Sequence, residues 1–173
     1  EKNAPQVPWE TPGTINHSWG YHRLDFQWKN FDSLLTSLLT NAHHGGAFTL
    51  NVGPLPDGSF PRAARRRLQQ FAAWMEVNGS ALQPTRRSPF AAGTLPDGLR
   101  ATLGPVTQLP HFNLLVLRPL PPGDLVIPQP LSLESGATEF RAQVLETGQL
   151  LAVQTNPEGQ LVVSIPAELA GLD

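Results

Sequence analysis

The residues of this sequence that are best suited to chemistry lie close together near its beginning. A carboxylate follows an indole at Trp9 and Glu10, and two more aromatic side chains follow at Trp19 and Tyr21, in a stretch rich in Pro and Gly that is predicted to be a loop. Aromatic faces pack against the C–H faces of sugars, and a carboxylic acid beside an indole has its charged form disfavoured. An acid that keeps its proton near neutral pH can protonate a leaving oxygen. From residue types alone, the simpler interpretation is still favoured, in which Trp9 fills a core and Glu10 is a solvated loop carboxylate.

A wider set of sequence landmarks changes which interpretation of Trp9 and Glu10 is favoured. The landmarks are Trp9-Glu10, Thr14-Ile15-Asn16, Ser18-Trp19-Gly20-Tyr21, Gly45-Gly46, Leu50-Asn51-Val52-Gly53-Pro54, Asp57-Gly58 and Val77-Asn78-Gly79. In this order and at these spacings the sequence resembles the alpha-L-fucosidases, glycoside hydrolase family 29. The resemblance is continuous over about residues 7–82 and fainter over 112–166. A single Trp-Glu pair would carry no weight, whereas several landmarks in register are specific.

The resemblance implies a retaining glycosidase that removes terminal alpha-linked L-fucose from fucosylated oligosaccharides or glycoconjugates. In such enzymes two carboxyl groups about 5–5.5 Å apart flank the anomeric carbon. Glu10 matches the family's acid/base glutamate and Trp19 an aromatic position that borders the fucose, with Tyr21 as a weaker substrate-binding candidate. Pro8 and Pro12 replace the Lys and Cys that commonly flank this motif, and both fix φ and remove a backbone donor.

The family's nucleophile is an aspartate at the end of an earlier barrel strand. Asp57 and Asp97 precede Gly in turns, and Asp25 and Asp32 lie beside or in a helix, so none of these four resembles it. We therefore expect the chain alone to be inactive. It begins with Glu1 and no initiator Met, which favours a fragment of a longer protein.

The first half has the periodicity of an α/β architecture. An apolar i, i+3, i+4, i+7 pattern predicts a helix over 31–42, capped by Asn30 or Asp32 and ended by Gly45-Gly46. Residues 47–52 form a short apolar run typical of a strand buried on both faces, and we expect its neighbours on both sides to be missing. A second helix is predicted from Pro61 to a C-cap at Asn78-Gly79.

From about residue 85 prolines and glycines cluster and short β-rich runs recur. Strands are predicted over 112–117, 125–127, 140–145, 150–154 and 161–165, with one or two more within 86–110 and a hairpin connection at 156–159. Such spacing indicates a sandwich. With the resemblance, the expected fold is α/β plus all-β: residues 1–85 are the C-terminal part of a (β/α)8-like TIM barrel, and residues 86–173 are a small antiparallel β-sandwich truncated at its end.

Composition narrows the functional classes further. The chain has 173 residues, a formal charge of −2 and no cysteine. We expect no nucleic-acid or membrane partner, because the charge is near zero and no apolar run reaches the roughly 20 residues of a membrane span. No cofactor or metal is expected, and compartment and oligomeric state stay open. The alternative function is a non-catalytic module: for residues 86–173, a structural role is favoured over carbohydrate binding, since Trp and Tyr are absent after Trp74.

The remaining polar residues receive modest roles. His17 and His22 lie where they could reach a sugar, whereas adjacent His43 and His44 point about 100° apart on a helix and make poor joint ligands. Asn51 is expected either to support the site by a hydrogen bond or to satisfy backbone groups where the chain turns. His111 is expected to be structural, and the arginines at 62, 65, 66 and 67 to form a solvated helix face.

Overall fold

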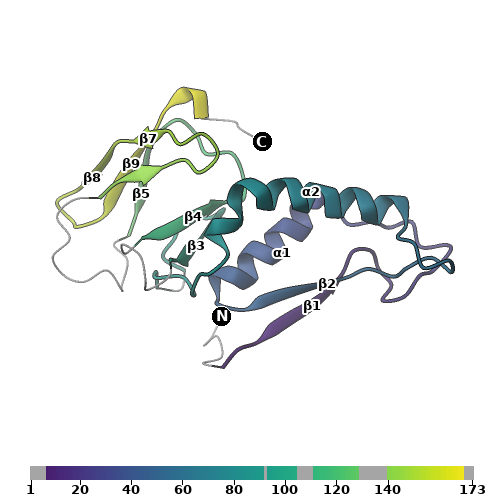
Figure 1. The fold of residues 1–173 in the computed structure, drawn as a ribbon. Helices are drawn as coiled ribbons and strands as arrows, with labels where there is room; N and C mark the ends of the chain where they lie inside the picture. The colour runs from purple at the N-terminus through teal and green to yellow at the C-terminus, as the bar shows by residue number, and fades with distance from the viewer. Residues whose placement is uncertain (1–6, 92, 105–110, 129–139, 170–173) are drawn as a thin grey trace.

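The computed structural model describes residues 7–91, 93–104, 111–128 and 140–169 (Figure 1). The elements, in chain order, are β1 (Glu10–Thr14), α1 (Phe31–His43), β2 (Ala47–Asn51), α2 (Arg62–Asn78), η1 (Gly79–Ala81), β3 (Leu99–Leu103), β4 (Phe112–Val116), β5 (Gly123–Ile127), β6 (Ala142–Gln143), β7 (Leu150–Leu151), β8 (Val153–Thr155), β9 (Leu161–Ile165) and η2 (Ala167–Leu169). Helix and sheet are mixed, and no closed barrel forms among these residues. In the same ranges no helix is long and apolar enough to cross a membrane.

In the first half, β1 and β2 pair in parallel and the two helices pack beside them (Figure 1). Asn30 caps α1 as predicted, its side chain accepting a hydrogen bond from the Ser33 N–H at 2.8 Å. The buried side chains Ile15, Leu34 and Ala64 form a cluster with the half-buried Leu50 of β2. The helices therefore cover the face of the strand pair to which Leu50 points.

Two expectations about this half are wrong. Residues 10–14 form a strand, although their Pro and Gly predicted a loop, so β2 has a neighbour on one side. β2 is not buried on both faces, since Ala47 and Thr49 are exposed on the face that no helix covers. The predicted end of the second helix is confirmed, since α2 ends at Asn78 with Gly79 as its C-cap, and Gly79, with φ −58°, leads into η1.

The second half consists of antiparallel strands. β3 pairs with β4, β9 lies between β5 and β8, and β6 pairs with β7. The predicted hairpin joins β8 to β9, with the Asn156 N–H donating to the Gln160 carbonyl at 3.0 Å and Gly159 at φ +77°. Strand 161–165 has its predicted bounds, whereas the segment predicted over 140–145 contains only the two residues of β6.

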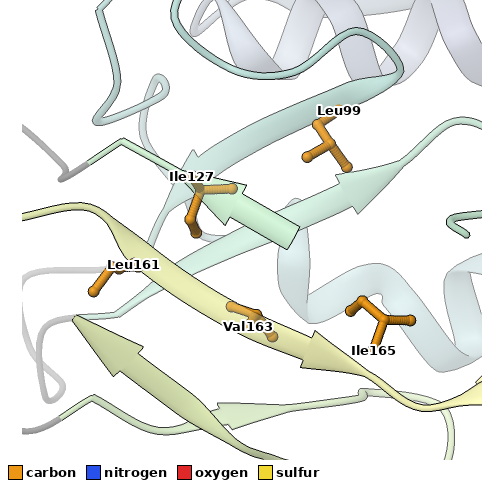
Figure 2. Close-up of a cluster of buried hydrophobic side chains, with 5 residues drawn as sticks. All are labelled: Leu99, Ile127, Leu161, Val163 and Ile165. Atoms are coloured by element: carbon orange, nitrogen blue, oxygen red, sulfur yellow. The ribbon is translucent and has the colours of Figure 1, made fainter. Parts of the chain in front are cut away.

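The β3–β4 pair and the β5–β9–β8 sheet are joined by an apolar cluster. Its members come from β3, β5 and β9 and point toward one another (Figure 2): they are Leu99, Ile127, Leu161, Val163 and Ile165. Phe112 and Leu114 of β4 pack against the same cluster. Because side chains alternate along a strand, Asn113 and Leu115 of β4 face the other way.

That second face of the β3–β4 pair lies on the helices. Leu115 of β4 is buried with Leu39 of α1 and Ala81 of η1. Hydrogen bonds cross the same interface. The His43 ring accepts a hydrogen bond from the Ala101 N–H at 3.1 Å, and the Thr102 hydroxyl donates to the Ala81 carbonyl at 2.6 Å. The molecule thus stacks helices, one strand pair and one sheet in succession, and the two halves share a packed interface.

Candidate active site

The aromatic residues singled out in the sequence lie on a loop, residues 16–28, that leaves the carboxyl end of β1. The base of the loop is closed by backbone hydrogen bonds, from Ile15 N to the Asn51 carbonyl (3.2 Å) and from Lys29 N to the Ile15 carbonyl (3.1 Å). The Lys29 Nζ adds a bond to the Thr14 carbonyl at 2.8 Å. A loop whose ends meet in this way is an Ω-loop, a class often used for function.

Asp25 organises the inside of this loop. Its Oδ2 accepts from the His17 N–H at 3.1 Å and from the Ser18 hydroxyl at 2.5 Å, and its Oδ1 accepts from the Gln27 N–H at 3.0 Å. The Ser18 hydroxyl contributes most to holding the pKa of Asp25 below its ordinary value, and the two backbone donors act in the same direction. Hydrogen bonds to the charged form of a carboxyl group favour ionisation.

Trp19 and Tyr21 project from the loop into solvent. Their exposed fractions are 59 % and 43 %, and Leu24 and Phe26 of the same loop are still more exposed. The backbone beneath them is held by the segment after β2: the Asn51 amide donates to the Trp19 carbonyl at 2.5 Å. A Cβ on Gly53 would lie 2.5 Å from the carbonyl carbon of Gly20, so only glycine allows the two backbones to approach so closely.

Asn51 therefore does what both of its expected roles describe, since it satisfies a backbone carbonyl and thereby supports the aromatic loop. Sequence reasoning missed Asp25, which was noticed only as an unsuitable nucleophile. Asp25 could have been identified from its spacing from Ser18 within a segment that has no helical or strand periodicity. Ser and Asp commonly hydrogen-bond to nearby backbone groups in turns.

Glu10 lies at the opposite end of the strand pair. It is the first residue of β1 and pairs in register with Ala47, whereas Thr14 pairs with Asn51 at the end that carries the loop. Four residue steps along a parallel strand correspond to about 13 Å. The Glu10 carboxylate is exposed and accepts a hydrogen bond from the Thr49 hydroxyl at 2.6 Å, on the face that the helices leave open.

The structure accordingly brings Trp19 and Tyr21 onto one loop but does not bring Glu10 to them. The indole next to Glu10 in sequence does not cover it either. Trp9 packs on Gly46, where an added Cβ would lie 2.4 Å from the ring, and consecutive side chains on a strand point to opposite faces.

A shallow cavity of about 210 Å³ lies beside the aromatic loop. Its wall combines Tyr21 with the polar side chains Asn16, His22 and Asp25, and with Arg62 at the start of α2. His22 thus lies beside Tyr21 in the wall of this cavity, and its reach to a sugar stays a prediction. The cavity is small beside the 300–1,000 Å³ typical of ligand pockets.

The other polar candidates serve the fold. The rings of His43 and His44 meet edge to face, His43 bonding to Ala101 and His44 to the Thr40 carbonyl. In the part of the chain that the structure describes, no group of three or more His, Asp or Glu side chains is arranged for a metal ion. Of the four helix arginines, three are exposed, whereas Arg67 donates to the Lys29 carbonyl at 2.9 Å.

Comparison with known proteins supplies a family context. Residues 1–80 match the family model described as alpha-L-fucosidase. The chain is 29 % identical over 161 residues to the plasma alpha-L-fucosidase of Rattus norvegicus, covering 91 % of this chain and 34 % of that protein. The human plasma alpha-L-fucosidase is 28 % identical over 161 residues, covering 91 % and 33 %. The chain thus spans about a third of the length of these curated relatives.

Solved structures agree at the level of the fold. The crystal structure of Thermotoga maritima alpha-fucosidase in complex with fucose superposes with a TM-score of 0.77 at 24 % identity, over 95 % of this chain and 38 % of that one. A complex of the same enzyme with a mechanism-based inhibitor gives a TM-score of 0.74 at 25 % identity, over 95 % and 37 %.

Proposed function

Since this chain is a relative of the alpha-L-fucosidases, we propose that it forms part of a glycoside hydrolase that releases terminal alpha-linked L-fucose from oligosaccharides or glycoconjugates. Residues 1–85 are proposed to be the C-terminal part of its catalytic (β/α)8-like barrel, and residues 86–173 the β-sandwich that follows. The Ω-loop at the carboxyl end of β1 carries this proposal, because active sites of such barrels gather at the carboxyl ends of the strands. Exposed aromatic rings on a hydrogen-bonded loop at that end suit the apolar face of a sugar.

Within this function, Trp19 is proposed to border the fucose and Tyr21 to contribute a second contact. Both rings are accessible, and the backbone between them is fixed by Asn51 and Gly53. A preorganised loop presents its rings without an ordering cost at the moment of binding. The reaction proposed is retaining, with a nucleophilic aspartate outside this chain.

The acid/base role of Glu10 stays a prediction, and its position counts against it. A general acid must lie within hydrogen-bond reach of the leaving oxygen, whereas Glu10 is about 13 Å of strand away from the end that carries Trp19. Its hydrogen bond with Thr49 supports a second possibility, that Glu10 is a polar member of the barrel interior.

Two substrates separate these roles. In the protein that contains the whole catalytic domain, Glu10→Gln is compared with wild type on 4-nitrophenyl alpha-L-fucoside and on a fucosyl disaccharide. A general acid is needed for the poor leaving group and not for the nitrophenolate, so loss on the disaccharide alone would support the acid/base role. Equal loss on both, accompanied by a lower melting temperature, would assign Glu10 to the barrel interior.

The family activity itself is tested with the same aryl fucoside. We expect hydrolysis by the protein with the whole catalytic domain and none by residues 1–173 alone. The absence of fucoside hydrolysis by the longer protein would overturn the proposed function, and turnover by the 173-residue chain would show that the nucleophile lies within it.

The sandwich is proposed to support the barrel and not to bind sugar. Its β3–β4 pair is occupied on both faces, by the helices on one side and by the second sheet on the other. Saturable binding of fucosylated glycans by a variant of the protein lacking the Trp19 ring would instead support a carbohydrate-binding module.

A further inference from the structure

The segment that carries Trp19 and Tyr21 has no helix or strand of its own to hold it. Between the ends of the Ω-loop, residues 16–28, the backbone forms turns, bends and irregular segments only. Such a segment would be mobile unless side chains fix it, because each freely rotating backbone residue costs about 1–2 kcal/mol to order. The position of the aromatic rings therefore depends on a small number of identifiable contacts.

One carboxylate supplies most of the contacts inside the loop. Asp25 accepts from His17 and Ser18 on one arm of the loop and from Gln27 on the other. The Asp25 N–H also donates to the His22 carbonyl at 3.1 Å, which closes a turn directly after Tyr21. Asp25 thus ties together both arms that flank the aromatic residues.

Contacts from outside the loop hold the residues that directly follow Ser18. Ser18 is held by Asp25, the Trp19 carbonyl by Asn51, and the Gly20–Tyr21 backbone lies against Gly53. Consecutive residues are therefore fixed by different partners, one inside the loop and the others outside it. Loss of the Asp25 contacts would leave Trp19 attached by its carbonyl alone, with its ring free to leave the sugar-binding orientation.

We propose that Asp25 is a positioning residue that holds Trp19 and Tyr21 in place for the sugar, acting through the Ser18 hydroxyl and the backbone of residues 17 and 27. This inference rests on the proposed function for its consequence, but the geometry it describes is independent of it. Asp25 is not proposed to touch the substrate or to take part in bond breaking.

Asp57 provides a matched control in the same chain. It is also a loop aspartate paired with a serine, exposed where Asp25 is half-buried, and it accepts from the Ser59 N–H at 2.9 Å and the Ser59 hydroxyl at 2.7 Å. Its loop carries neither Trp19 nor Tyr21. An effect of losing a serine–aspartate pair in general would appear in both variants, whereas a positioning effect would appear only in the Asp25 variant.

The kinetic test uses 4-nitrophenyl alpha-L-fucoside and the protein with the whole catalytic domain. Asp25→Ala is expected to raise KM about tenfold with kcat within about twofold of wild type, because the contact with Trp19 is made equally in the ground and transition states. Ser18→Ala, which removes one bond, should give a smaller increase in KM, and Asp57→Ala none. An unchanged KM in Asp25→Ala, or an equal increase in Asp57→Ala, would overturn the proposal.

A second readout does not depend on catalysis. The indole N–H resonance of Trp19 is identified by its loss in Trp19→Phe and followed by NMR in the same set of variants. Asp25→Ala and Ser18→Ala should shift or broaden it, whereas Asp57→Ala should leave it unchanged. If wild type fails to hydrolyse the fucoside, the function is wrong while this signal still decides the positioning role, and an unaltered Trp19 resonance in Asp25→Ala would refute that role.

Discussion

The Ω-loop and the antiparallel sheets of the second half hold their chains in opposite ways. In the loop, large apolar side chains point to solvent while a carboxylate, a hydroxyl and an amide fix the backbone. In the sheets, Leu161, Val163 and Ile165 point inward and few side-chain hydrogen bonds are needed (Figure 2). The first arrangement leaves apolar surface available to a ligand, and the second removes it from water.

Because of this difference, substitutions in the two regions should affect different properties of the protein. Burial contributes about 25 cal/mol for each Å² of apolar surface, so changes in the sheets should alter stability. Exposed rings contribute little to folding, so changes in the loop should alter binding.

The largest effect is expected in the core of the sheets. Leu161 is 2 % exposed, and Leu161→Ala should lower the free energy of unfolding by about 2–5 kcal/mol, since it removes buried methyl groups and leaves a cavity. Urea denaturation followed by circular dichroism measures the change. Leu150→Ala is the control, because Leu150 is 70 % exposed and its loss should stay within about 0.5 kcal/mol. Equal losses would contradict the assigned core.

The loop should show the reverse behaviour. Trp19→Ala is expected to reduce kcat/KM for an aryl fucoside about tenfold, equivalent to about 1.4 kcal/mol. Its effect on the free energy of unfolding should stay within about 0.5 kcal/mol, because the side chain is mostly exposed. A large loss of stability with normal kinetics would show that the ring packs in the folded protein and does not serve the sugar.

Sequence reasoning succeeded where a pattern was local and repeated. The helix beginning at Phe31 with its Asn30 cap, and the strand Leu161–Ile165 with its preceding hairpin, follow from periodicity and turn chemistry. β1 was missed because Pro12 and Gly13 both disfavour strands, and pairing with β2 overrides that local preference.

The site was harder to predict for the same reason. Glu10 and Trp19 are near in sequence, which predicts one shared loop, but the strand between them places them at opposite ends of the strand pair. The supports of Trp19 come from Asn51 and Gly53, far along the chain. No local pattern encodes such contacts, because they arise only when β1 and β2 lie side by side.

A smaller effect should accompany acidification of the two loops built on aspartate. Asp25 and Asp57 have pKa values below the ordinary 3.8, owing first to the Ser18 hydroxyl and to the Ser59 N–H respectively. A lowered folded-state pKa stabilises the fold above pH 3.8, and that stabilisation is lost as the pH falls through the folded value. The unfolding free energies of wild type and Asp25→Asn should therefore converge between about pH 4 and pH 2. A difference that widens toward acid would contradict this assignment.

The smallest effect is expected from the exposed ion pair between Arg118 and Asp97, whose atoms lie 3.0 Å apart. Asp97→Asn should change the free energy of unfolding by no more than about 0.5 kcal/mol, since surface pairs are offset by side-chain entropy and screened by salt. Measurements at low and high salt provide the check. A loss comparable with that of Leu161→Ala would show that polar contacts, and not burial alone, hold the sheets.

The interface at which Leu115 meets Leu39 and Ala81 also has a practical consequence for protein engineering. Because the composition changes near residue 85, truncation at that point is the obvious way to obtain a minimal catalytic domain. Such a truncation would expose Leu39, which is 1 % accessible, and would remove the hydrogen bond between the His43 ring and Ala101. The truncated protein would therefore expose an apolar surface, and its solubility would fall. A useful minimal version would retain β3 and β4 as a built-in cover for the helices.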